Sequence, residues 1–283
     1  MLCGPHRSGK PSVTTSATLG NAPADLWVQS THGQMFVRSW FPDAGALRPN
    51  CAPILLLHES LGCIEQWKDF PAALAQATGR TVVAYDRLGF GRSDRLTAPP
   101  APTFVEDEAA HGFAQVLDHL GIERFVVVGH SVGGSMAVHC AAQYPAACQA
   151  MITMSAVTFV EPRTLEGIRQ ARSWFADPAQ RERLRRYHGE RSDWVLSAWI
   201  DTWLAPDFAS WTLAHALPQV RCPALAIHGD NDEFGSERHP QLIAQHAGGH
   251  VEQALLPDVG HVPHREQPDV VLERVGRFLR AIG

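Results

Sequence analysis

Short apolar runs alternate with amphipathic stretches along most of the chain. The apolar runs occupy residues 52–58, 80–86, 124–130, 148–156, 222–230 and 251–256. Runs of this length, bounded by turn signals, predict strands that are buried on both faces of a sheet. Upstream of them, two strand-like segments flank Thr31-His32-Gly33 and predict an antiparallel hairpin.

The stretches between the apolar runs predict helices. The predicted helices include residues 67–78, 104–120 and 266–281. Strands that alternate with helices form a mainly parallel sheet with helices on both faces. The sequence therefore predicts an α/β fold with a sheet of about eight strands.

Residues 158–217 interrupt this alternation. The segment contains no strand-like run, but it has several helical stretches and five of the eight tryptophans: Trp174, Trp194, Trp199, Trp203 and Trp211. A helical insertion between two strands predicts a lid over the carboxyl edge of the sheet. We expect most of these tryptophans to pack inside the lid and one or two to reach a substrate pocket.

The composition is that of an ordinary globular protein. Of the 283 residues, 45% are hydrophobic and 19% are charged, and the formal net charge of −5 argues against a nucleic-acid-binding surface. The basic run at 181–188 predicts a solvated helix face, and no apolar stretch approaches the roughly 20 residues that span a bilayer. The predicted organisation is a disordered leader at 1–22, a core of residues 23–157 and 218–283, and a helical cap at 158–217.

The predicted leader, residues 1–22, and the six cysteines give information about the cellular compartment of the protein. Residues 1–22 lack the apolar segment of a secretory signal. The six cysteines are scattered and form no Cys-x-x-Cys pair, which in a chain of this length indicates reduced, mostly buried thiols. The reduced thiols predict a cytoplasmic protein.

A serine lies in an unusual setting at the end of the run 124–130. Residues 129–133 read GHSVG and fit Gly-x-Ser-x-Gly, and helix formers follow them. A strand, a tight turn and a helix are the context in which this motif presents a nucleophilic serine, and small neighbours allow the close backbone approach that the turn needs. Ser131 is therefore the candidate nucleophile, and the amide of Val132 is a candidate oxyanion donor.

A serine hydroxyl needs a base to act as a nucleophile at neutral pH. Two predicted strand-end loops carry candidates, HGDNDEFG at 228–235 and LPDVGHVPHREQP at 256–268. The chain order of serine, acid and histidine is that of an α/β-hydrolase triad. His261 is the candidate base, and either Asp230 or Asp232 would orient its imidazole.

Five motifs together resemble the α/β-hydrolase superfamily over about residues 24–281. They are LLLHESLG, YDRLGFGRSD, GHSVGG, HGDND and GHVPH. Within the superfamily, the chain looks most like small bacterial cap-bearing serine hydrolases with a His-Glu-x-Leu-Gly oxyanion loop. The resemblance implies an acid three residues after Gly229, which selects Asp232. It also implies that the second oxyanion amide lies in the first of these motifs, at Ser60 or at Leu61.

The oxyanion loop departs from the common His-Gly pattern, because Glu59 follows its histidine. A carboxylate aimed at the hole would oppose the oxyanion, so we expect Glu59 to point away and to bind a basic or amide partner. Carbon–carbon bond hydrolases of the same fold commonly carry tryptophan after the catalytic histidine, where this chain has Val262, which disfavours that reaction without excluding it. The candidate substrate-pocket residues are Leu61, Trp199, Trp203 and Val262.

These features predict a serine hydrolase that cleaves a small carboxylic ester, a lactone or a thioester through an acyl-enzyme. No cofactor or metal is expected, because His261 and His264 have no partner cluster with zinc-site spacing. His264 could line the pocket, support a catalytic residue or lie at the surface, and of these we expect the surface. We assign no chemistry to His130.

Other functions of the same fold remain alternatives, because a fold and a triad do not name a reaction. They are carbon–carbon bond hydrolysis, acyl transfer, perhydrolysis and a low-turnover ligand receptor or signalling protein that retains the triad. The expected partner is a small-molecule substrate, and neither nucleic acid nor membrane is expected to bind. The sequence does not indicate an oligomeric state.

Overall fold

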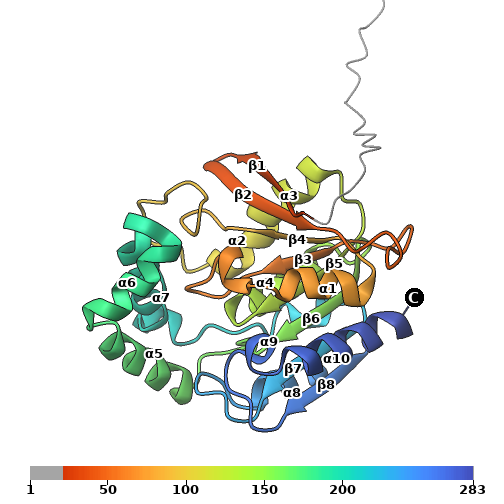
Figure 1. The fold of residues 1–283 in the computed structure, drawn as a ribbon. Coiled ribbons are helices and arrows are strands. Elements are labelled where there is room, and N and C mark those ends of the chain that lie inside the picture. Colours follow the sequence, from red (N-terminus) through yellow and green to blue (C-terminus); the bar gives the residue numbers. More distant parts are fainter. Residues whose placement is uncertain (1–21, 283) are drawn as a thin grey trace, which may run out of the picture.

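The computed structural model describes residues 22–282, and the predicted leader lies outside the described residues apart from Ala22. The central sheet has the strand order β1-β2-β4-β3-β5-β6-β7-β8. Its strands are β1 (Ala24–Ser30), β2 (Gly33–Trp40), β3 (Ile54–Leu57), β4 (Val82–Tyr85), β5 (Phe125–His130), β6 (Cys148–Met154), β7 (Ala224–Gly229) and β8 (Val251–Leu256). The pairs β1–β2 and β2–β4 are antiparallel and all others are parallel, which confirms the predicted mainly parallel sheet of eight strands (Figure 1).

Helices on both faces of this sheet and in the insertion complete the described fold. The α-helices are α1 (Phe70–Thr78), α2 (Phe104–Ala110), α3 (Gly112–Leu120), α4 (Val132–Gln143), α5 (Pro162–Trp174), α6 (Pro178–His188), α7 (Ser192–Trp203), α8 (Arg238–His246), α9 (Pro263–Glu266) and α10 (Pro268–Ala281). Successive side chains of a strand point to opposite faces, so Leu55 joins one core and Leu56 the other. The first core includes buried residues of α3, α4 and α8, and the second includes residues of α1 and α10.

The predicted helix at 104–120 is two helices, α2 and α3. The backbone leaves the helical conformation at His111, with φ −115° and ψ −91°. A Cβ on Gly112 would lie 2.2 Å from a carboxylate oxygen of Glu108, so a side chain here would displace that carboxylate. Ala109 and Phe113 stay on one buried face across the break. The apolar periodicity therefore continues where the helix does not.

The insertion predicted from the tryptophan-rich segment is helical and lies between β6 and β7. Its helices α5, α6 and α7 form a group to one side of the sheet in Figure 1, and α7 packs against both α5 and α6. An antiparallel bridge between Phe159 and Thr212 joins its two ends. The basic run lies on α6, which buries Leu184 and exposes its arginines. Within residues 22–282, no helix has both the length and the apolar character of a membrane span.

Candidate active site

Ser131 occupies the turn between β5 and α4. Its backbone has φ 54° and ψ −124°, a conformation that costs energy for a residue with a side chain. A Cβ on Gly129 would lie 2.1 Å from the carbonyl oxygen of Gly133, and a Cβ on Gly133 would lie 2.1 Å from the carbonyl oxygen of Leu57. Only glycine fits either position, which explains why the strained serine has a glycine two residues away on each side.

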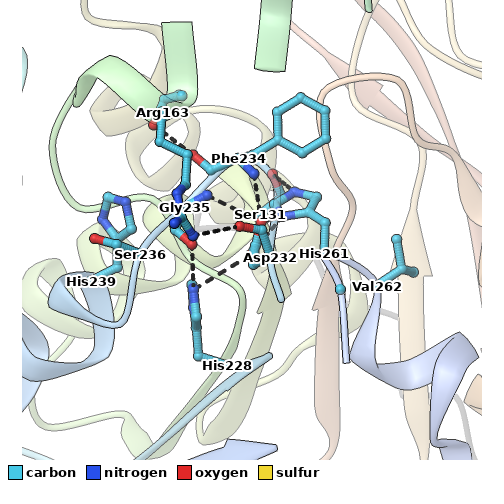
Figure 2. Close-up of polar contacts among 12 residues, drawn as sticks. Ser131, Arg163, His228, Asp232, Phe234, Gly235, Ser236, His239, His261 and Val262 are labelled. Atoms are coloured by element: carbon cyan, nitrogen blue, oxygen red, sulfur yellow. Dashed lines mark hydrogen bonds and ion pairs between the residues drawn. The ribbon is translucent and has the colours of Figure 1, made fainter. Parts of the chain in front are cut away.

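The structure brings three of the predicted side chains together. His261 Nε2 lies 2.9 Å from Ser131 Oγ, and His261 Nδ1 lies 2.9 Å from each carboxylate oxygen of Asp232 (Figure 2). The side chains come from the loops that follow β5, β8 and β7, so they meet at the carboxyl edge of the parallel strands. Asp232 is buried, whereas Asp230 is exposed and forms no hydrogen bond with His261 in the described structure.

Asp232 is held in its ionised form by several donors. Its Oδ1 accepts hydrogen bonds from the amides of Phe234 and Gly235, and His228 Nε2 lies 3.5 Å from its Oδ2 (Figure 2). Burial acts to raise the pKa of Asp232, but the charge and hydrogen bond of His261 outweigh burial and lower the pKa to about 2. Burial acts to lower the pKa of His261, but Asp232 outweighs that effect and raises it above the ordinary value.

The loop after β3 lies beside Ser131 and contains Ser60 and Leu61, the two alternatives for the second oxyanion donor. No acceptor among residues 22–282 takes the amide hydrogen of Val132, Ser60 or Leu61. The loop is anchored by Asp86, whose carboxylate accepts the amide of Ile64 at 2.6 Å and the amide of Arg92 at 2.8 Å. Unpaired amides next to a serine hydroxyl are available to an anion.

Glu59 has the basic partner that the sequence led us to expect. Its Oε2 lies 3.5 Å from Nδ1 of His130, and Nε2 of the same ring lies 2.8 Å from the carbonyl oxygen of His261. Burial acts to raise the pKa of Glu59, but the hydrogen bond and charge of His130 outweigh it, and the pKa falls below the ordinary value. His130, to which we assigned no chemistry, therefore links the oxyanion loop to the histidine loop.

The expectation that His264 lies at the surface is wrong. The side chain is buried, because its ring packs against Trp67 at 4.8 Å, Phe70 at 5.3 Å and His130 at 4.8 Å between centroids. Burial lowers the pKa of His264 well below its ordinary value, so the ring is neutral near pH 7. The histidine lies only three residues from His261, and sequence spacing alone did not reveal that both face inward.

A cavity of about 490 Å³ and one of about 620 Å³ meet at this site. The larger one contains Ser131 and His261 and is bordered by all four candidate pocket residues, Leu61, Trp199, Trp203 and Val262. To its remaining wall the insertion contributes apolar side chains, among them Ile168, Phe175 and Leu184, and polar ones, among them Arg183. The smaller cavity shares Ser60, Trp199 and Trp203 with it and also has polar groups in its wall, among them Arg87 and Glu108.

The tryptophans of the insertion reach these cavities more often than the one or two that we expected. Trp174, Trp199 and Trp203 border the larger cavity, and Trp194 borders the smaller one. Trp211 packs instead against Trp203 and Phe208, with ring centroids 5.7 Å and 5.5 Å apart. Among the described residues, the one group of three potential metal ligands lies outside both cavities.

The fold and this serine-bearing turn define an α/β-hydrolase. The profile of the alpha/beta hydrolase fold family matches residues 52–216. Serine hydrolase BPHL of Homo sapiens is 30% identical over 240 residues, which cover 80% of this chain and 79% of that protein. The chain belongs to the alpha/beta hydrolase fold family.

Other relatives carry different hydrolase names. A 2-hydroxy-6-oxononadienedioate/2-hydroxy-6-oxononatrienedioate hydrolase of Paraburkholderia phymatum is 27% identical over 256 residues, covering 78% of this chain and 84% of that protein. The structure of a thermophilic esterase from Thermogutta terrifontis superposes with a TM-score of 0.68 at 20% identity, covering 92% of this chain and 99% of that one. At this identity, the structural likeness concerns the fold alone.

Proposed function

We propose that the protein is a serine hydrolase that cleaves small carboxylic esters, lactones or thioesters through an acyl-enzyme. The observation that carries this proposal is the hydrogen-bonded series Ser131, His261 and Asp232, with 2.9 Å at each step. His261 takes the proton of Ser131 as Oγ attacks the carbonyl carbon, and the ionised Asp232 stabilises the resulting imidazolium. The imidazolium then protonates the leaving group as its bond to the acyl carbon breaks.

The second half-reaction releases the acyl group. His261 removes a proton from water, the water oxygen attacks the acyl carbon, and the ester bond to Ser131 breaks with return of the proton to Oγ. In both halves a negative charge develops on the substrate oxygen. The free amides of Val132 and Ser60 support an oxyanion hole at this position, with Leu61 as the alternative second donor.

The insertion would act as a cap that supplies most of the substrate contacts. Its apolar and aromatic side chains border the cavity that contains Ser131, which favours a substrate with an apolar acyl or alcohol group. We propose the division into a core of residues 23–157 and 218–283 and a cap of residues 158–217 on this basis. The expected partner is a small molecule, and a cytoplasmic location remains a prediction.

One relative supports a second candidate reaction. The hydrolase of Paraburkholderia phymatum is named for a 2-hydroxy-6-oxo dienedioate, and carbon–carbon bond hydrolysis was among the alternatives that the sequence left open. We favour ester hydrolysis, because Val262 follows His261 where carbon–carbon bond hydrolases of the same fold commonly have tryptophan.

Steady-state assays on a graded set of substrates test the proposal. The set contains p-nitrophenyl esters of increasing acyl length, a lactone, a thioester and a 2-hydroxy-6-oxo dienoate. Sustained turnover of an ester by the wild-type protein, lost in Ser131→Ala, supports the proposal. Turnover of the dienoate alone would show that the second candidate is right, and no turnover of any member would favour a receptor.

A further inference from the structure

Three side chains of the kinds that bind transition metals meet on a part of the molecule away from the proposed active site. Glu106 belongs to α2, His139 belongs to α4, and His215 lies just before the short 3₁₀ turn Leu217–Gln219. One possible ligand atom from each lies within 4.8 Å of the others. Nε2 of His215 lies 3.7 Å from Oε2 of Glu106.

His139 distinguishes this group from a chance surface cluster. Its side chain is about nine-tenths buried, and its ring forms no hydrogen bond with any residue from 22 to 282. The ring faces that of His215, with centroids 5.6 Å apart and planes at 50°. The ion pair between the exposed Glu106 and His215 does not include the ring of His139, which faces that of His215. The imidazole of His139 therefore has a lone pair that a bound ligand can accept.

We propose that Glu106, His139 and His215 form a binding site for a divalent transition-metal ion of the zinc type. Two imidazoles and one carboxylate are ligands that Zn²⁺ prefers, and a water molecule completes a tetrahedron. A tetrahedral ion with bonds of about 2.1 Å places its ligand atoms roughly 3.4 Å apart. Glu106 and His215 are exposed and can rotate toward the fixed ring of His139 to reach that spacing.

The surrounding elements form a frame for such a site. Both α2 and the turn Leu217–Gln219 pack against α4, so the three ligands approach from elements that already touch. His215 lies in the segment through which the helical insertion returns to β7. A bound ion would therefore join this return segment to α2 and α4 and stabilise the folded chain by its binding free energy. It touches neither Ser131 nor the cavities beside it, and the site does not depend on the proposed hydrolase function.

Calorimetric titration of the purified, metal-free full chain tests the site, with Zn²⁺, Ni²⁺ and Mg²⁺ as separate probes. We expect one Zn²⁺ or Ni²⁺ per chain and no detectable Mg²⁺, because Mg²⁺ prefers oxygen ligands. His215→Ala and Glu106→Gln change exposed side chains and should keep the fold, and each should weaken Zn²⁺ binding at least tenfold. His246→Ala removes an exposed histidine elsewhere on the surface and serves as the matched control.

A second readout separates this site from loose binding by the other histidines. Zn²⁺ should raise the melting temperature of the wild type and of His246→Ala, and should leave that of His215→Ala unchanged. It should also slow amide hydrogen exchange in residues 212–219 of the wild type. The proposal is overturned if no one-to-one Zn²⁺ complex forms, or if His215→Ala binds Zn²⁺ as tightly as His246→Ala does. His139→Ala is a third variant that should also lose Zn²⁺ binding. If it fails to fold, the comparisons of His215→Ala and Glu106→Gln with His246→Ala decide the question.

Discussion

The ring of His130 lies between Glu59 and the backbone of His261, with Nε2 of His130 2.8 Å from the carbonyl oxygen of His261. His130 immediately precedes the strained Ser131, so one ring connects the turn of the serine, the oxyanion loop and the loop of the histidine. We expect a shift of any one of these three segments to move the other two. The relative placement of Ser131 and His261 therefore depends on residues that do not touch the substrate carbonyl.

This connection predicts an effect of Glu59 on the pH profile. The negative charge of Glu59 favours the charged form of His261 and so contributes to its raised pKa. Glu59→Gln removes that charge, so the acid limb of kcat/KM should move to lower pH. The variant also weakens the contact with His130. We expect kcat/KM on the pH-independent plateau to fall about tenfold, which corresponds to the low end of the free energy of a hydrogen bond to a charged group.

Glu123→Gln is the matched control for this experiment, because Glu123 is exposed in the loop before β5. Its profile should coincide with that of the wild type. An unchanged acid limb in Glu59→Gln would show that Glu59 holds the loop by packing alone.

The pH dependence of the wild type follows from the neutral form of His261, which alone can accept the serine proton. Asp232 raises the pKa of His261 above its ordinary value, so protonation inactivates the free enzyme at a higher pH than for an ordinary histidine. We expect kcat/KM to rise with pH through an apparent pKa above about 6.5. A profile of kcat/KM from pH 5 to 9 measures this limb, and a flat profile would contradict a histidine base.

The two aspartates of the loop after β7 should differ sharply. Asp232→Asn favours the wrong tautomer of His261 and removes the charge that stabilises its cation, so kcat should fall by roughly 10⁴-fold. Asp230 is exposed at the end of its strand, and Asp230→Asn should leave kcat within a factor of two or so. Steady-state kinetics of the two variants, side by side, checks the assignment. The reverse pattern would identify Asp230 as the acid.

The tryptophans of the insertion should separate into two roles. Trp174 is about half exposed and borders the larger cavity, so Trp174→Ala should change the preferred acyl length with little effect on the melting temperature. In an apolar pocket, two substrates that differ by one methylene group differ by about 1–3 kcal/mol in transition-state binding, so the change in preference should be graded. Melting curves and acyl-length profiles of the same protein samples measure both effects.

Trp211→Ala is the matched comparison, because Trp211 packs against Trp203 and Phe208 and borders neither cavity. It should lower the free energy of unfolding by a few kcal/mol, up to about 3–5 for a fully buried tryptophan, and leave the acyl-length profile unchanged. If both variants lose stability alike and neither changes the profile, the cavity beside Ser131 does not select the acyl group.

The strands and the serine turn were predictable because their signals are local. Each buried strand is a short apolar run, and the turn needs glycine at 129 and 133 wherever the chain is placed. The helix break at His111 was not predictable, because the buried face continues through it. The burial of His264 and the place of Trp174 at a cavity also depend on packing between distant segments, which periodicity does not encode.

The proposed active site likewise has some residues with local sequence signals and others whose contacts depend on the folding of distant segments. Ser131 and His261 stand in short motifs, whereas the link from Glu59 through His130 to the carbonyl of His261 appears only once the three loops are folded together. The group of Glu106, His139 and His215 has ligands far apart in the sequence, so a search for zinc-site spacing could not detect it.

Mass-spectrometric peptide mapping after treatment with a fluorophosphonate tests the proposed nucleophile most directly. The reagent forms a stable phosphonyl ester with an activated serine and loses fluoride. We predict one adduct per chain on the peptide that contains Ser131, formed in parallel with the loss of esterase activity and strongly slowed in Asp232→Asn. An adduct on another residue, or full activity with no adduct at Ser131, would contradict the account.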